Sequence, residues 1–252
     1  CLRKDRAMAK RPRLRTVEKY RPPYPLNNFP VGFALNLGKE IVYLLASRGT
    51  PRLEGTDWEE IFARLIGAKW QPSNVGLDDI ILQQTAWGAK TVKNKKPSTV
   101  SKVRLISGRN SVAFSFGQEK VKNVDPNDMG EKVLSIYNER VAGVRKKFQH
   151  LRTVVLVKSD DLLELSAFEF DTVMYDPKAY WWQWNDNDNL EGYDKDGDCH
   201  VFTWQPHGSQ FTIIENVPEH RLAIRIRKPP RLDRDEVLEA LKFDESWIEV
   251  IS

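Results

Sequence analysis

The fold is decided by two neighbouring runs, Gly76-Leu77-Asp78-Asp79-Ile80-Ile81-Leu82 and Trp87-Gly88-Ala89-Lys90-Thr91-Val92. The leading glycine and the β-branched residues of the first run predict a strand, and a short turn at residues 83–86 returns the chain along the second. Side chains two apart on a strand share a face, so a neighbouring strand can present Asp79 or Asp78 beside Lys90. The sequence therefore predicts a β-hairpin that brings a carboxylate close to an ammonium group.

A helix is predicted immediately before this hairpin. Thr56-Asp57-Trp58-Glu59 has the arrangement of a capping box, and the apolar residues of 58–66 follow at helical spacing until Gly67. Glu59 falls about a quarter turn from the buried stripe, whereas Glu60 lies nearly opposite it. Glu59 is thus the better candidate to reach a site beside the hairpin. The alternative is that Glu59 only caps its helix.

The remaining pattern predicts an α/β protein with a mixed β-sheet flanked by helices. We expect a basic arm over 1–23, a core over 24–175 and a β-rich lobe over 176–252 that packs on the core. The core is expected to contain helices at 37–47 and 131–150 and strands at 102–106, 111–116, 152–158 and 162–173. The lobe is expected to contain strands at 211–214 and 222–226 and a final helix at 233–241.

The order of helix, aspartate strand, lysine strand, helix and buried strand resembles the PD-(D/E)XK nuclease superfamily, notably type II restriction endonucleases. The resemblance covers roughly residues 56–158 and implies a restriction endonuclease-like fold that hydrolyses double-stranded DNA at a specific sequence. Asp79 matches the motif's aspartate, which binds the metal and directly precedes the apolar run, and Lys90 matches the lysine that positions the attacking water. The implied cofactor is Mg²⁺, for which Mn²⁺ can substitute. Many such enzymes are homodimers, so the resemblance also allows a homodimer.

One position departs from that pattern. Gly88 stands where the superfamily has Glu or Asp, so one metal ligand is missing from its usual place. Three explanations remain open: Gln84 ligates through its amide oxygen, a carboxylate such as Glu59 arrives from another element, or the protein is inactive. We therefore expect the catalytic set to comprise Asp79, Lys90, Glu59 and Gln84, with Asp79 and Glu59 on the metal. The alternative function is a non-catalytic DNA-binding protein with a degenerate nuclease fold.

Polar side chains with aromatic neighbours mark a candidate DNA-reading surface. Amides pair with adenine and arginine with guanine in the major groove, and exposed loops usually supply such contacts. The expected DNA-binding residues are Arg109, Asn110, Gln205, His207, Ser209 and Gln210. The alternative is that the nearby tryptophans are core residues and that the amides only cap turns.

Charge and cysteine content set further expectations. The chain has 252 residues and a net charge of +4, but residues 1–23 alone carry nine basic and two acidic side chains. Such an arm suits a phosphate backbone, although it could merely solvate the chain end. The two cysteines, Cys1 and Cys199, are too few for a disulfide framework and indicate a reducing, cytoplasmic location. Apolar runs such as 41–46 are too short to span a membrane, so no membrane association is expected.

Overall fold

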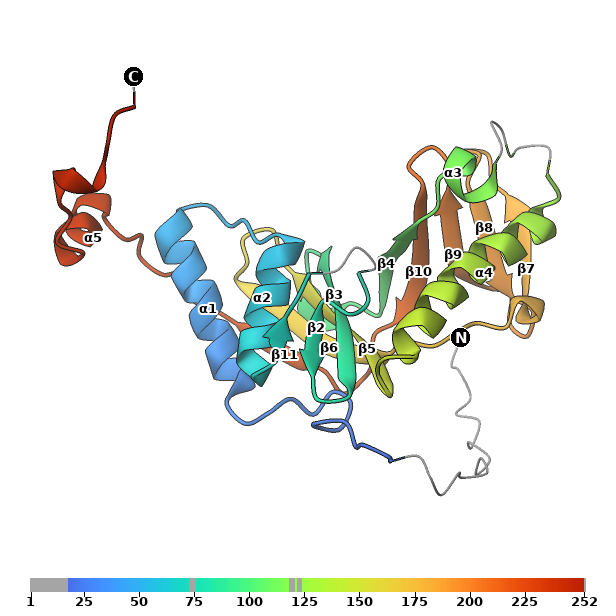
Figure 1. The fold of residues 1–252 in the computed structure, drawn as a ribbon, viewed down its shortest axis with the longest axis horizontal. Coiled ribbons are helices and arrows are strands. Elements are labelled where there is room, and N and C mark those ends of the chain that lie inside the picture. Colours follow the sequence, from blue (N-terminus) through green and yellow to red (C-terminus); the bar gives the residue numbers. More distant parts are fainter. Residues whose placement is uncertain (1–17, 73–75, 118–120, 122–123, 252) are drawn as a thin grey trace.

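The chain folds into a mixed α/β structure in which helices pack against two β-sheets (Figure 1). The computed structural model describes residues 18–72, 76–117, 121 and 124–251. Most of the predicted basic arm, residues 1–17, lies outside these ranges. The helices of the described residues are α1 (Phe33–Arg48), α2 (Gly55–Ile66), α3 (Val112–Phe116), α4 (Pro126–Arg145) and α5 (Arg234–Ala240), with single 3-10 turns η1 (Pro97–Thr99), η2 (Pro177–Ala179) and η3 (Glu245–Trp247).

The first sheet has the strand order β1-β2-β3-β5-β6-β11. Its strands are β1 (Lys69–Trp70), β2 (Ile80–Leu82), β3 (Thr85–Lys93), β5 (His150–Lys158), β6 (Glu164–Asp171) and β11 (Leu222–Arg225). The predicted hairpin is confirmed, with Ile80 of β2 opposite Trp87 of β3, although β2 begins only at Ile80 rather than at Gly76. β3 and β5 are parallel and every other pair is antiparallel, so this is the expected mixed sheet.

Helices α1 and α2 cover one face of this sheet (Figure 1). Trp58 and Phe62 of α2 are fully buried, and the Phe62 ring meets the Trp87 ring edge-on at 6.0 Å. Burial of such large rings is the main source of stability at this face. The strict helical spacing of the apolar residues of α2 is therefore what attaches it to the hairpin.

The N-terminus of α2 differs from the prediction. The helix begins at Gly55, and Glu54 rather than Thr56 is the N-cap residue. The Glu54 backbone nitrogen donates to Asp57 Oδ2 at 2.7 Å, so Asp57 supplies the reciprocal bond of the capping box. Glu59 lies two residues beyond Asp57 along the helix and takes no part in this cap.

The second sheet is antiparallel, with the strand order β4-β10-β9-β8-β7. Its strands are β4 (Lys102–Arg109), β7 (Tyr180–Trp184), β8 (Leu190–Asp194), β9 (Cys199–Gln205) and β10 (Gln210–Asn216). Its inner face buries Trp182 and Trp204 in one cluster with α4, as the core alternative for the tryptophans predicted. β4 lies within 24–175 and β11 within 176–252, so a division at residue 175 does not separate the two sheets.

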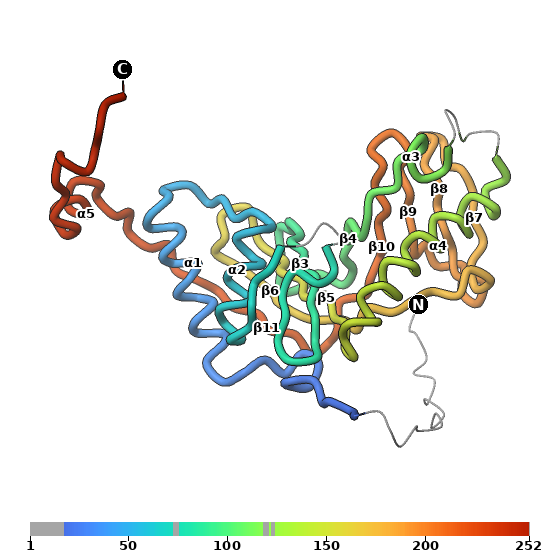
Figure 2. The backbone as a smooth tube through the Cα atoms, in the orientation of Figure 1, coloured from blue at the N-terminus to red at the C-terminus, as the bar shows by residue number. Residues whose placement is uncertain are grey.

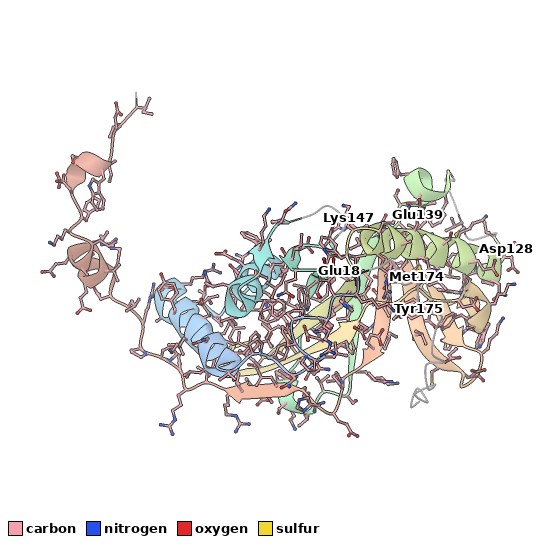
Figure 3. The ribbon with its side chains drawn as sticks, turned by 60° about the horizontal axis from the view of Figure 1, so that its bottom comes forward. Glu18, Asp128, Glu139, Lys147, Met174 and Tyr175 are labelled. Carbon is pink, nitrogen blue, oxygen red and sulfur yellow. The ribbon has the colours of Figure 1, made fainter. Side chains whose placement is uncertain are left out.

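Helix α4 connects the two sheets. It begins beside β7, where Asn127 accepts a hydrogen bond from the Trp182 backbone, and it ends at the start of β5. Figure 3 shows Asp128 near its first turn, Glu139 farther along and Lys147 just beyond its end. The predicted helix over 131–150 thus exists but begins and ends about five residues earlier.

A predicted strand at 111–116 is wrong, because residues Val112–Phe116 form helix α3. The Ser111 side chain accepts a hydrogen bond from the Phe114 backbone and caps this helix. Within the described part of the chain no helix is both long and apolar enough to cross a membrane.

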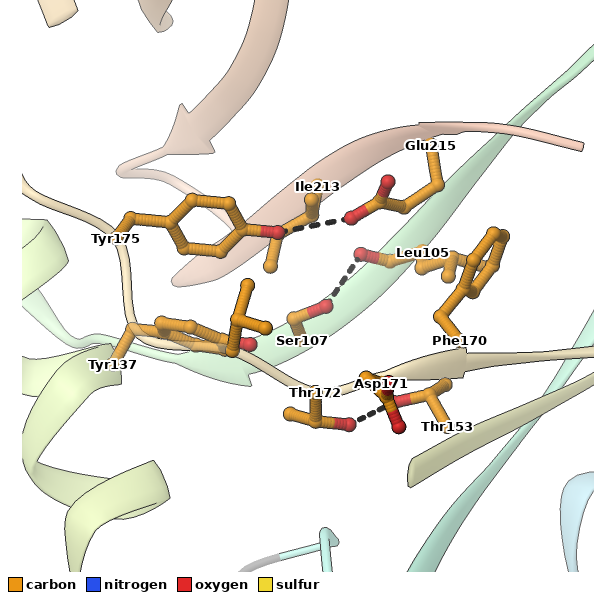
Figure 4. A pocket seen from close by; sticks show the side chains of 11 residues that line it. Leu105, Ser107, Tyr137, Thr153, Phe170, Asp171, Thr172, Tyr175, Ile213 and Glu215 are labelled. Atoms are coloured by element: carbon orange, nitrogen blue, oxygen red, sulfur yellow. Dashed lines mark hydrogen bonds between the residues drawn. The ribbon is translucent and has the colours of Figure 1, made fainter. Parts of the chain in front are cut away.

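A small polar cavity lies where the two sheets and α4 meet (Figure 4). Tyr175 donates to Glu215 across it at 2.9 Å, and the hydroxyls of Thr153 and Thr172 lie 2.8 Å apart. Its volume of about 20 Å³ suits a single water molecule rather than a substrate.

Candidate active site

Asp79 lies directly before β2, at the edge of the hairpin. Its side chain is 4% exposed, and its carbonyl accepts a hydrogen bond from the Gln71 backbone at 2.7 Å. Continuing the β2–β3 register by one residue places Asp79 opposite Gly88. Asp79 therefore shares a face of the hairpin with Gly88 and Lys90, as the hairpin spacing predicted.

Lys90 is half-buried on β3. Trp87 and Ala89 belong to the core under α2, so Lys90 points to the opposite face of the strand. Loss of solvent lowers the pKa of its ammonium group, while the charges of Asp79 and Glu59 oppose this shift. Lys90 is thus a desolvated cation with two carboxylates in its field.

Glu59 extends from α2 to the same group. Its carboxylate accepts a hydrogen bond from Trp70 Nε1 of β1 at 3.3 Å, which directs it away from its own helix cap. Burial raises the pKa of Glu59, the Trp70 bond and the Lys90 charge lower it, and the Asp79 charge raises it. The three residues form one electrostatic unit, which we call the Glu59–Asp79–Lys90 cluster.

Gly88 has no room for the acid that the resemblance implies. A Cβ atom at Gly88 would lie 2.7 Å from the Gly76 carbonyl oxygen and 3.1 Å from Leu77 Cα. Because both contacts are with backbone, the chain before Asp79 fills the space that a carboxylate at this position would need. Position 88 therefore cannot supply a carboxylate ligand, because the backbone of residues 76–77 occupies the space.

Gln84 does not join the cluster. It lies at the hairpin turn beside Gln83, which has a φ of 54°, and its carbonyl accepts from the His150 backbone. Six residues of strand separate it from Lys90, a distance of about 20 Å at 3.3 Å per residue. Of the two candidates for the extra ligand, the structure brings only Glu59 to the cluster.

The cluster fits a hard divalent cation in part. Asp79 and Glu59 offer the carboxylate oxygens that Mg²⁺ prefers, and Mg²⁺ commonly uses one or two protein carboxylates with several waters. Within the described ranges, no group of three or more His, Cys, Asp or Glu residues is arranged to hold a metal. Asp78 is a further nearby carboxylate, but its Oδ2 lies 3.8 Å from Lys147 Nζ of the α4–β5 connection.

The predicted DNA-reading residues gather at one end of the second sheet. Gln210 pairs with Arg109 on one side and with Gln205 on the other, and the Asn110 backbone donates to the Ser209 carbonyl. His207 is exposed in the same β9–β10 turn. These side chains, widely separated in sequence, therefore do form a single surface region.

Asn110 differs from its neighbours in this region, because it is only 1% exposed. Its carbonyl accepts from Trp204 Nε1 at 3.1 Å, and its side-chain oxygen accepts from Arg140 at 3.2 Å. Asn110 thus joins the β4 end to β9 and α4, and it is not available to read a base.

Arg140 of α4 is a residue that the sequence did not single out for this region. Its guanidinium donates to the Arg109 carbonyl at 2.7 Å and covers Gly108, where a Cβ atom would lie 1.9 Å from it. The sequence signal was available in principle: Gly108 marks a strand position that another group approaches closely.

A scan against models of protein families and searches of curated proteins and of solved structures found no match. The function must therefore be inferred from the chemistry of the cluster and of its surroundings.

Proposed function

We propose that this chain is a metal-dependent endonuclease of the restriction endonuclease type, acting on double-stranded DNA at the Glu59–Asp79–Lys90 cluster. The observation that carries the proposal is the half-buried Lys90, whose pKa is lowered by desolvation beside two carboxylates from other elements. Such perturbed groups concentrate at functional sites, since burying a lysine without purpose costs stability. The parallel pairing of β3 with β5 supports the same proposal, because it continues the order that resembles the nuclease superfamily.

In this proposal each residue of the cluster has one role. Asp79 and Glu59 would hold Mg²⁺, which supplies polarisation of the scissile phosphate and acidification of a water. Lys90 would position the attacking water and exchange a proton at Nζ, for which a lowered pKa is an advantage.

The surface formed by Arg109, Gln205, His207, Ser209 and Gln210 would contact the DNA. A guanidinium, two amides, an imidazole and a hydroxyl supply the donors and acceptors that distinguish base edges in the major groove.

A second candidate function, a non-catalytic DNA-binding protein, is favoured by one observation. The backbone at Gly76 and Leu77 excludes an acid from position 88, and within the described ranges no three acids, histidines or cysteines are arranged to hold a metal. If two carboxylates cannot retain the ion, the chain would bind DNA without cutting it.

Plasmid cleavage distinguishes these functions. Purified protein with Mg²⁺ or Mn²⁺ is expected to cut a mixed-sequence plasmid, and Lys90→Ala is expected to lower the rate at least 100-fold, the order contributed by acid–base groups. Lys93→Ala is the matched control, because Lys93 lies on the same strand with its side chain 73% exposed. DNA binding, followed by gel shift in Ca²⁺, should survive in both variants. Binding without cutting by the unmodified protein would instead support the second function.

A further inference from the structure

The last twenty described residues form an arm that extends away from the rest of the molecule. This C-terminal arm (residues 232–251) contains α5 and η3, and Figure 2 shows it projecting beyond α1. At its root, Leu232 donates a backbone hydrogen bond to the Ala46 carbonyl of α1 at 3.0 Å. A groove of about 840 Å³ separates α5 from Tyr43 and Ser47 of α1, so the arm is attached to the body but does not pack on it.

The arm carries apolar side chains that a solvated segment would not be expected to carry. Within it only Leu238 is even half-buried. The exposed apolar members are Leu232, Val237, Leu241, Phe243, Trp247, Ile248, Val250 and Ile251, from 37% exposed at Val237 to 91% at Ile251. Exposed apolar side chains concentrated in one short segment in this way mark an interaction site.

The outer face of α1, whose Tyr43 lines the same groove, also carries exposed apolar side chains. Leu35 and Tyr43 are 65% and 68% exposed, and Val42 lies between them at 37%. Residues at this spacing lie along one side of a helix. The body therefore has an uncovered apolar stripe close to the root of the uncovered apolar arm.

The net charges of the arm and of the segment before it indicate which partner covers the arm and the apolar stripe of α1. Residues 233–251 contain seven acidic and two basic side chains, a net charge of −5, whereas residues 221–231 contain five basic and no acidic side chains, a net charge of +5. Arg225, Arg227, Lys228 and Arg231 of this basic segment are exposed. Two copies placed about a twofold axis would each offer an acidic arm to the basic segment of the other, as an isologous interface requires.

Contact within one chain is disfavoured by the linker. Pro229-Pro230 lies near the end of the basic segment, two residues before the arm, and consecutive prolines hold the backbone extended. The arm would have to reverse at once to reach residues 225–228 of its own chain. A second copy meets no such restriction.

We propose that the C-terminal arm docks on α1 and on the basic segment 221–231 of a second copy of this chain, and that the exchange of two arms makes a symmetric dimer. This proposal is independent of the proposed nuclease function, because its readout is mass alone.

The first test is the molar mass measured by light scattering over a range of concentrations. The full chain is expected to reach twice its mass of 29.2 kDa, and a chain ending at Leu232 is expected to stay monomeric with an unchanged circular dichroism spectrum per folded residue. A full chain that remains monomeric, or a truncated chain that still dimerises, would overturn the proposal.

A mixing experiment identifies the contacts. Arg227→Glu with Lys228→Glu lowers the net charge of the basic segment from +5 to +1, and Asp235→Lys with Glu236→Lys changes that of the arm from −5 to −1. Each double variant alone should dimerise far more weakly than the full chain, since an arm of −5 would face a segment of +1, or an arm of −1 a segment of +5, at both contacts. Their equimolar mixture should restore the dimer, because one of its contacts then pairs an arm of −5 with a segment of +5. Lys132→Glu with Lys146→Glu, at two exposed positions of α4 and its C-cap, is the matched control and should dimerise normally, because α4 packs on β5, β7 and β8. If the mixture stays monomeric while the control dimerises, the arm packs elsewhere, on its own chain or on another partner, and the proposal fails.

Discussion

At the scale of single residues, Lys90 combines a proposed catalytic role with a cost in stability. Its ammonium is desolvated in the folded state, so its pKa is lowered below the ordinary value of 10.5 that an unfolded chain retains. Below the folded pKa, Lys90 is charged in both the folded and the unfolded state, so the folded state bears the whole free-energy penalty of desolvating the ammonium. As pH rises from the folded pKa to 10.5 the penalty disappears, because the unfolded lysine also becomes neutral.

Lys90→Met should therefore stabilise the protein at neutral pH. Replacing the buried charge with an apolar side chain of similar length is expected to raise Tm by about 2 to 4 °C at pH 7, the shift that about 1 kcal/mol produces in a chain of this size. The gain should shrink as pH approaches 10.5. Thermal unfolding at pH 7 and pH 10 measures this, with the exposed Lys93→Met as the control. A lower Tm for Lys90→Met at pH 7 would mean that the ammonium stabilises the fold.

Gly88 allows a second prediction at this scale. Restoring the superfamily's acid by Gly88→Asp should not increase cleavage, because the new Cβ atom would press on the backbone of Gly76 and Leu77. Overpacking of this kind is expected to lower the free energy of unfolding by about 1 to 3 kcal/mol. Urea unfolding measures the loss. Gly143→Ala is the control, since a Cβ at this exposed helical position has no neighbour within 4 Å and should be neutral or stabilising. A stable and faster Gly88→Asp enzyme would refute this account of the site.

The residues of the cluster also show how far sequence reasoning can reach. Asp79 and Lys90 were predictable, because a strand's alternation and a tight turn determine which side chains share a face. Glu59 was predictable from its position on the helix, but its hydrogen bond to Trp70 was not. Gln84 was wrongly predicted to lie in the site. It is close to Lys90 in sequence, but it lies at the turn of the hairpin, six residues of extended strand away from Lys90. Asn110 was predicted to be a DNA contact and is instead a buried connector.

At the scale of elements, the docking of α4 on the second sheet depends on one close approach. A Cβ atom at Gly130 would lie 2.2 Å from the ring of Trp182. Helix α4 can therefore approach β7 this closely only because residue 130 has no side chain. Gly130→Ala is expected to displace the indole and to cost about 1 to 3 kcal/mol despite the better helix propensity of alanine. Urea unfolding gives the cost, and near-ultraviolet circular dichroism reports the tryptophan. Gly143→Ala, on the same helix, isolates the propensity effect. An unchanged tryptophan signal would contradict this packing.

Local pattern predicted the elements that have one dominant signal. The apolar spacing of α2 and the continuous apolar run of β5 each identify their element without tertiary information. Val112–Phe116 has no such signal, since a short alternating run satisfies both periods and only the Ser111 cap decides for a helix. Strands β7, β8 and β9 were not predicted individually, because asparagine, aspartate and glycine turns interrupt their aromatic residues. The pairing of β4 with β10 joins residues about one hundred positions apart, and no local pattern encodes it.

At the scale of the whole molecule, charge is segregated along the chain. Residues 1–17 carry seven basic and one acidic side chain, and the C-terminal arm from Asp233 to Ile251 has a net charge of −5. The formal charge of +4 is thus the small sum of +6 and −5 at the two ends and +3 from the residues between them. In the proposed dimer the acidic arms would be neutralised by basic segments of the partner, which would leave the N-terminal basic residues as the excess charge available to a polyanion.

Removal of residues 1–17 should therefore change the salt dependence of DNA binding more than its sequence preference. This truncation removes a net charge of +6 and leaves a chain of −2. If these side chains contact phosphates, the slope of log K against log salt concentration should become shallower by up to about 6, since each contact contributes about 0.9. Binding titrations at several salt concentrations, in Ca²⁺ and on two DNA sequences, measure both the slope and the preference. An Arg109→Ala variant provides the contrast: a side chain that reads a base should alter the preference and leave most of the slope. Equal slopes for the full and the truncated chain would show that residues 1–17 only solvate the end of the chain.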